Sequence, residues 1–247
     1  MSNCEQITNS ALEHFEGIHT LALTNNENIT DAALVHIKGI HTLDISFSQQ
    51  FTDAAFVHLE GIHTLDIRFG LNYTDAALAH IHGIHTLYMD DCKISDAGLV
   101  HLKGIHTLSM INCTRITDAG FVHLKGIHTL TMIECDQITD AAIVHLKGIH
   151  TLIMSYCKQV TDEAIVHLKG IHSLCLQGVD KITGASFAHI KGIQSLSITG
   201  CALITDEAFV HLEGIQKLDI RGFEHITDAA IAHLKGIKTL YMNFCTK

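Results

Sequence analysis

An eight-residue phrase recurs along the whole 247-residue chain. It reads Ile-Thr-Asp-Ala-Ala-Leu-Val-His at 29–36 and returns with small changes. A fixed period of this length is the signature of a solenoid, in which each repeat covers the hydrophobic face of its neighbour. Ten intervals, nine of 22 residues and one of 21, separate the second residues of the phrase: Thr8, Thr30, Thr52, Thr74, Ser95, Thr117, Thr139, Thr161, Thr183, Thr205 and Thr227. We therefore expect one domain over residues 1–247, built from about eleven repeats.

Each repeat predicts a strand followed by a short helix. In residues 40–48, the apolar side chains of Ile40, Leu43 and Ile45 alternate with polar ones, as in a half-buried strand. Residues 52–61 begin with the capping residue Thr52 and end at a glycine. Their apolar residues fit one side of a helix of about two turns.

This arrangement is similar to the leucine-rich repeat, whose core pattern is Leu-x-x-Leu-x-Leu-x-x-Asn/Cys. Here the pattern reads Ile84-x-x-Leu87-x-Met89-x-x-Cys92, and it returns at 105–113 and 127–135. With the following Ile-Thr-Asp, it resembles the cysteine-containing subclass found beside F-boxes in ubiquitin-ligase receptors. The copies are shorter than is usual in that subclass, and the chain has no segment for an F-box. The resemblance implies an α/β fold, a right-handed curved solenoid with a parallel sheet on its concave face and short helices on its convex face.

Seven of the eight cysteines occupy the ninth position of the pattern, where the chain turns from strand into loop. They are Cys4, Cys92, Cys113, Cys135, Cys157, Cys201 and Cys245. This position lies inside the coil and suits a small side chain with a weak donor. We expect buried free thiols rather than disulfides. Cys175 alone alternates outward on its strand.

The formal net charge of −10 argues against a nucleic-acid partner, because polyanion binding depends on clustered Lys and Arg. The polar N-terminus lacks the pattern of a signal peptide, and no apolar run is long enough to cross a bilayer. From these features we expect a cytoplasmic protein with no membrane contact.

Nineteen of the twenty-one histidines form two columns, which invite a zinc hypothesis. One column follows the helices, and the other stands where each strand starts, from His19 and His41 to His172. Imidazoles of neighbouring coils could share a metal ion, but a specific site breaks the symmetry of its scaffold, and these residues repeat with it. We therefore expect the columns to stack or to form hydrogen bonds, to bind no metal, and to make the protein sensitive to acid. A column of threonines beside them predicts hydroxyl ladders between the strands.

No catalytic motif is present: the chain has no Gly-x-Ser-x-Gly, no phosphate-binding loop, no His-Glu-x-x-His and no Cys-x-x-Cys. We therefore expect a protein that is not an enzyme and that needs no cofactor.

Positions that hold the same residue type in most repeats build the coil. The outward strand positions vary from repeat to repeat and are free for recognition. Aromatic residues and Arg on this face are typical of binding hot spots, and the acidic setting favours a protein partner with exposed Lys or Arg. The candidate residues are Phe47, Arg68, Phe69, Tyr88, Asp90, Asp91, Ile111, Ile133, Tyr156, Arg221, Tyr241 and Phe244. For Phe47 and Phe69, the alternative is packing inside the loop beside Phe51 and Tyr73. For Arg68, Tyr88 and Asp90, we expect exposure to solvent.

The leading hypothesis is a module that binds another protein on its concave face. A second hypothesis is a structural element that assembles into homo-oligomers through uncapped ends of the solenoid. The family resemblance implies a third, the recognition of substrates for a ubiquitin ligase.

Overall fold

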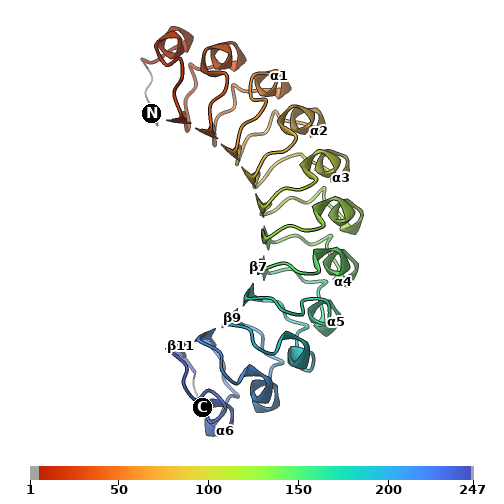
Figure 1. The fold of residues 1–247 in the computed structure, drawn as a ribbon. Helices are drawn as coiled ribbons and strands as arrows, with labels where there is room; N and C mark the ends of the chain where they lie inside the picture. The colour runs from red at the N-terminus through yellow and green to blue at the C-terminus, as the bar shows by residue number, and fades with distance from the viewer. Residues whose placement is uncertain (1–5, 246–247) are drawn as a thin grey trace. The chain divides into compact units, whose positions relative to one another are not determined.

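Eleven short strands alternate with helical turns in residues 6–245, which are the residues that the computed structural model describes. Cys4, in the predicted cysteine column, lies outside these residues. The chain forms two units, Met1–Ile127 and His128–Lys247, and each is described by itself. Within each unit, the strands lie on one side and the helices on the other (Figure 1). The predicted α/β solenoid with a parallel sheet and short helices is confirmed.

The sheet of the first unit is parallel and follows chain order. Its strands pair in register, so that Leu21, Leu43, Leu65, Leu87 and Leu108 lie side by side. The strands are β1 (Thr20–Ala22), β2 (Thr42–Asp44), β3 (Thr64–Asp66), β4 (Thr86–Tyr88) and β5 (Thr107–Ser109).

The sheet of the second unit has the same construction, and its central leucines again pair from strand to strand. Its strands are β6 (Thr129–Ile133), β7 (Thr151–Ser155), β8 (Ser173–Cys175), β9 (Ser195–Ser197), β10 (Lys217–Asp219) and β11 (Thr239–Tyr241).

Residues 53–56 form fewer than the two turns predicted for 52–61. The helical segments have at most seven residues, and the longest reach about two turns. Many are 3₁₀ helices (labelled η), because each repeat has only a few residues in which to turn back to the sheet. In the first unit they are η1 (Asn9–His14), η2 (Asp31–Ile37), α1 (Asp53–Phe56), α2 (Asp75–Leu78), η3 (Ala79–Ile81), α3 (Asp96–Leu99), η4 (Val100–Leu102) and η5 (Asp118–Leu124). In the second unit they are α4 (Asp140–Ile143), η6 (Val144–Leu146), α5 (Asp162–Ile165), η7 (Phe187–Ile190), η8 (Asp206–Leu212) and α6 (Asp228–Ile231).

The Thr and Asp of the repeated phrase link neighbouring coils. The Thr52 hydroxyl accepts a hydrogen bond from the Ala54 amide and caps α1, as predicted. The carboxylate of Asp31, one coil earlier, accepts hydrogen bonds from the Thr52 amide at 2.8 Å and from its hydroxyl at 2.6 Å. Thr74, Thr117 and Thr161 make the same two contacts, so each caps its own helix while it binds the Asp of the preceding coil. The helix dipole therefore explains only part of the Asp column.

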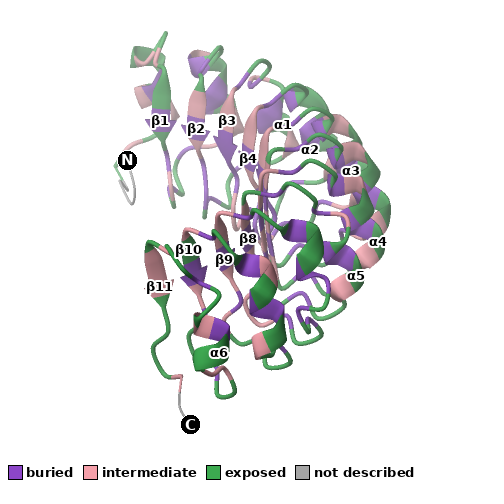
Figure 2. Ribbon diagram, turned by 60° about the horizontal axis from the view of Figure 1, so that its bottom comes forward, coloured by how far each residue is buried: buried purple, intermediate pink, exposed green. Residues whose placement is uncertain are grey.

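The core lies between the sheet and the helices of each unit, as the buried residues in Figure 2 show. Cys92, Cys113, Cys135, Cys157 and Cys201 are buried free thiols, as predicted, whereas Cys245 is half-buried. The thiols of Cys113, Cys157, Cys201 and Cys245 donate to carbonyl oxygens of the preceding coil, for example from Cys201 to Leu176 at 3.0 Å. Burial raises the pKa of Cys157 to about 11 and that of Cys201 to about 12, so these thiols stay protonated at neutral pH.

None of the helices in the described part of the chain has the length and apolar character that crossing a bilayer requires.

Candidate protein-binding surface

The sheet presents alternate strand residues away from the core, and we call this surface the sheet face. In β2, Leu43 is fully buried, whereas Thr42 and Asp44 are half-buried. After each strand the chain turns through one residue of positive φ, which is Phe47 in this coil. The sheet face therefore consists of the outward strand positions and this turn residue, as the sequence predicts.

Arg68 and Tyr88 form the centre of the sheet face in the first unit. The Arg68 guanidinium lies 5.6 Å from the centroid of the Tyr88 ring, which is a cation–π distance. Its Nε and Nη2 donate to the Asp66 carboxylate, at 2.6 Å for the shortest contact. The hydrogen bond to Asp66 raises the pKa of Arg68, and the charges of Asp66, Asp90 and Asp44 act in the same direction, whereas burial opposes them. Arg68 and Tyr88 are both half-buried, so the predicted exposure is only partial.

Phe47 and Phe69 lie on the surface, so the alternative of packing inside the loop is wrong. Their rings stack with centroids 4.3 Å apart, and Phe47 keeps 48% of its surface exposed. Phe51 and Tyr73 fill the loop core instead and are fully buried. Both phenylalanines have φ of 59°, a left-handed conformation that points the side chain out of the turn.

Asp90 is buried, with 4% of its surface exposed, so the prediction that it is exposed is wrong. Its carboxylate accepts hydrogen bonds from the Ser109 hydroxyl at 2.6 Å and from the Ile111 amide at 3.0 Å. These bonds satisfy a side chain that the neighbouring strand covers. Asp91 and Ile111 are half-buried, and the Asp91 carboxylate accepts from the Asn112 amide group at 2.6 Å.

The second unit brings Arg221 and Tyr241 together. The Arg221 guanidinium lies 5.8 Å from the centroid of the Tyr241 ring and donates to both carboxylate oxygens of Asp219. Phe244, the turn residue after β11, has 82% of its surface exposed. Tyr156 is 42% exposed, and its hydroxyl accepts a hydrogen bond from Gln177. Ile133 is half-buried. All twelve predicted residues lie on the sheet face of one unit or the other.

The carboxylates of Asp66 and Asp219, which hold the two arginines, are not among the predicted binding residues. Asp66 precedes Arg68 by two positions, and Asp219 precedes Arg221 by two. In a strand, residues two apart lie on the same face, so this spacing is the signal that would have found both ion pairs. Each arginine is consequently held in place and partly neutralised by its carboxylate.

The histidines at the strand starts stack along the edge of each sheet. In the first unit, the rings of His19, His41, His63, His85 and His106 follow one another with centroids 4.4–4.5 Å apart. The second unit stacks His128, His150 and His172 in the same way. Stacking, one of the two expectations for this column, is confirmed.

The histidines also form hydrogen bonds with the threonine column. The His85 Nδ1 lies 3.0 Å from the hydroxyl oxygen of Thr86, which follows it. The predicted hydroxyl ladder between strands is therefore wrong, because the adjacent imidazole takes the hydroxyl. Burial, and then the charges of neighbouring imidazoles, lower the pKa of His41, His85 and His150. Within residues 6–245, no group of three or more His, Cys, Asp or Glu is arranged to hold a metal ion.

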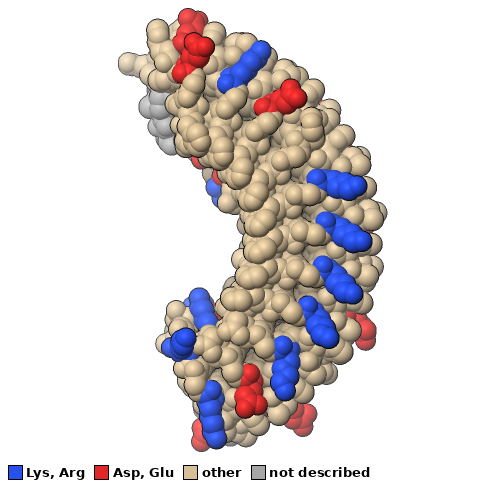
Figure 3. Space-filling view, viewed as in Figure 1, with Lys and Arg blue, Asp and Glu red and all other residues tan. Residues whose placement is uncertain are grey.

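The lysines that precede the repeat glycines, such as Lys103 in the first unit and Lys169 in the second, are exposed. On the face that Figure 3 shows, most of the Lys and Arg side chains are separated from one another by uncharged surface. This spacing is typical of solvated surface charges.

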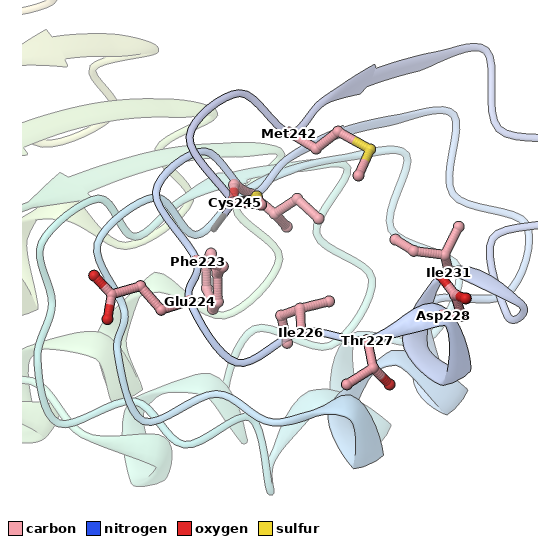
Figure 4. A pocket seen from close by; sticks show the side chains of 9 residues that line it. Phe223, Glu224, Ile226, Thr227, Asp228, Ile231, Met242 and Cys245 are labelled. Carbon is pink, nitrogen blue, oxygen red and sulfur yellow. Dashed lines mark hydrogen bonds between the residues drawn. The ribbon is translucent and has the colours of Figure 1, made fainter. Parts of the chain in front are cut away.

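A pocket of about 300 Å³ lies between the loops and helix of the last two coils (Figure 4). Phe223, Ile226, Ile231, Met242 and Cys245 line it. These residues stand at core positions of the repeat, and no further coil covers them in the described part of the chain. Met242 is accordingly 46% exposed. Most of the lining stands at core positions of the repeat, and Glu224 is the one residue of the lining at a variable loop position.

Comparison with known proteins identifies the fold. No family model matches the sequence, and no curated protein matches it. Among solved structures, the Rad7 and Elc1 complex in yeast contains a chain that matches with a TM-score of 0.67 and 17% identity, covering 97% of this chain and 79% of that one. A chain of the Toll–Spatzle complex of Drosophila matches with a TM-score of 0.75 and 13% identity, covering 97% of this chain and 35% of that one. A chain of the TLR13–ssRNA13 complex matches with a TM-score of 0.59 and 16% identity, covering 92% and 43%.

At these identities the likeness concerns the fold alone. The protein has the leucine-rich-repeat fold, with a parallel sheet and short helices.

Proposed function

We propose that the protein is a protein-binding module and that the sheet face of its first unit is the contact surface. The observation that carries this proposal is the cluster around Arg68, where a cation–π pair is surrounded by carboxylates. Arg and Tyr are the residue types enriched at the centres of interfaces. The stacked Phe47 and Phe69 add an exposed apolar surface on the neighbouring coils.

Charge supports a partner with exposed Lys or Arg. The sheet face of the first unit carries four carboxylates, on Asp44, Asp66, Asp90 and Asp91, and one guanidinium, on Arg68. Complementary charge accelerates association and suppresses partners of the wrong sign. The same carboxylates repel a phosphate backbone, so they oppose a nucleic acid as partner at this surface. Among the structural neighbours, Toll is in complex with Spatzle and Rad7 with Elc1, both proteins, whereas TLR13 is in complex with ssRNA.

The test is comparative affinity capture from the source cell. An Arg68→Ala, Tyr88→Ala double variant removes the centre of the cluster but leaves the buried Asp90 and its hydrogen bonds intact. Arg115→Ala is the matched control, because Arg115 is the other arginine of the first unit and its guanidinium lies on the loop side, bonded to the Lys93 carbonyl.

We expect the double variant to lose partners that the wild type and Arg115→Ala both retain. Raising the salt concentration should weaken the same interactions, because the contact depends on exposed charges. An identical set of captured proteins from all three forms would refute the proposed surface.

A further inference from the structure

A hollow of about 500 Å³ lies on the sheet face of the second unit and belongs to five of its strands, β7 to β11. Ile153 of β7 stands at one end of the hollow. Lys217, Arg221 and Tyr241, from the coils of β10 and β11, stand at the other. Between them, β8 and β9 line the hollow with the small residues Ser173, Cys175, Ser195 and Ser197 at their outward positions, together with the buried Leu174 and Leu196.

At the hollow, some residues of the repeat differ from those in the other coils. In β7, Thr151 still bonds to the preceding imidazole, with 3.2 Å between the His150 Nδ1 and the hydroxyl oxygen. In β9, serine takes the place of this Thr and Gln194 that of the His, and the Gln194 amide turns to the Gly192 carbonyl. Among the described residues, the hydroxyls of Ser195 and Ser197 have no side-chain partner. In other coils the hydroxyl at the Ser195 position is bonded to the preceding imidazole. Inside the hollow, the serine hydroxyls are therefore available as hydrogen-bond donors.

The wall at the β10 end carries more positive than negative charge. Arg221 uses its Nε and Nη2 on Asp219, so this pair is close to neutral. Lys217 is exposed, and its amine lies 5.8 Å from the centroid of the Tyr241 ring. In residues 6–245, no carboxylate lies within ion-pair distance of this amine. One cation thus remains uncompensated beside an aromatic ring that is 42% exposed.

We propose that this hollow binds an extended segment of a partner protein, with a carboxylate side chain against Lys217 and an apolar side chain against Ile153. The charge of Lys217 favours an acidic segment over a basic one. The four spacings from β7 to β11, each about 4.8 Å, span roughly 19 Å, which is the length of about six extended residues. Ser195 and Ser197 then face the middle of the segment, where their hydroxyls bind its backbone carbonyl oxygens. This site goes beyond the function proposed for the first unit, because no residue of the Arg68 cluster takes part in it.

The test uses a six-residue fluorescein-labelled peptide, Leu-Ala-Ala-Ala-Glu-Glu, and its reversed sequence, in fluorescence polarisation with the full chain. We expect one of the two directions to bind at least about tenfold more tightly than the same peptide with Gln in place of both Glu residues. Lys217→Glu should weaken binding by about tenfold or more. Lys147→Glu is the matched control, since Lys147 is an exposed lysine of the same unit that does not line the hollow.

Cys175 reports the place of binding independently, because it lines the hollow and is half-buried. In a Cys4→Ser, Cys245→Ser background, the peptide should slow the reaction of Cys175 with N-ethylmaleimide several-fold. The absence of peptide binding, binding that Lys217→Glu leaves unchanged, or an unchanged labelling rate would each overturn the inference. The Arg68→Ala, Tyr88→Ala variant should bind this peptide normally, so a failure here is distinguishable from a failure of the first-unit surface.

Discussion

The sheet faces of the two units share one backbone pattern but differ in charge and in surface shape. In the first unit, the charges of three carboxylates, on Asp44, Asp66 and Asp90, act on one guanidinium, and stacked phenylalanines lie on the same face. The second unit balances Glu134 and Asp219 with Lys217 and Arg221, and it has glycine at three successive turn positions, Gly178, Gly200 and Gly222. One surface is filled and acidic, whereas the other is hollowed and carries a free cation.

This difference shows how a repeat protein can acquire distinct surfaces without changing its coil. Thr–Asp hydrogen bonds between coils and paired central leucines occur in both units, so the backbone positions stay equivalent. Only the outward and turn positions change, and these contribute little to the core. Substitutions there can alter recognition while the fold is kept.

The largest effect on stability is expected where the turn glycines meet a neighbour. A Cβ at Gly178 would lie 2.4 Å from Cδ1 of Tyr156, and Gly178 has φ of 65°. Gly178→Ala should therefore lower the free energy of unfolding by about 2–3 kcal/mol, through steric overlap and backbone strain. Gly222→Ala, where no atom lies within 4 Å, should lose only about 1 kcal/mol from the strain. Urea denaturation of the two variants would measure the difference, and equal losses would contradict the role of Tyr156.

The stacked phenylalanines should contribute the next largest effect. Replacing Phe47 and Phe69 by Ala, singly and together, should show a coupling energy of about 1 kcal/mol, because a stacked aromatic pair is stabilising beyond its buried area. The matching coil pair of the second unit, Tyr156 and Gly178, has one ring only and provides no such coupling. A double-mutant cycle by urea denaturation checks this value, and additive losses would show that the stacking does not stabilise the fold.

A smaller effect is expected from the carboxylates that hold the arginines. Asp66→Asn should cost about 1 kcal/mol, since it weakens the hydrogen bonds to Arg68, whose side chain is 39% exposed. Asp219→Asn should cost less, because the Arg221 side chain is 52% exposed and better solvated. Thermal unfolding of both variants tests which of the two losses of stability is larger. A larger loss for Asp219→Asn would reverse this comparison of the two units.

The smallest expected effect per residue is the loss of folding stability as the pH falls. The lowered pKa values of His41, His85 and His150 mean that the unfolded chain binds protons more readily than the folded one. The stability is therefore full above the ordinary histidine pKa of about 6.5 and falls as the pH drops below it. We expect the Tm to decrease between pH 7.5 and pH 5.5.

Substitutions in the stacked histidine column test this prediction. Replacing His41 and His63 by Gln, the residue that the chain itself uses at Gln194 and Gln216, should reduce the pH dependence. His233→Gln, in the helix column, serves as the control. If the double variant and the wild type show the same pH profile, the stacked imidazoles are not responsible for the acid sensitivity.

Much of the site could be predicted from the sequence because the strand alternation assigns each residue to a face. Tyr156, Tyr241 and Phe244 all lie on the sheet face, where the alternation places them. The prediction failed for Asp90, because alternation says which face a side chain takes but not whether the next coil covers it. Its burial depends on Ser109, one coil further on, whose hydroxyl bonds to it.

The sequence by itself determined the period, the strand and helix positions and the buried columns, because these depend on local patterns that each copy restates. Only the tertiary structure decided which side chains meet between coils. Arg68 lies against Tyr88 twenty residues away, and the hollow beside Lys217 arises where small side chains of adjacent strands coincide. Contacts of this kind depend on side-chain size and conformation across strands, which a one-dimensional pattern does not specify.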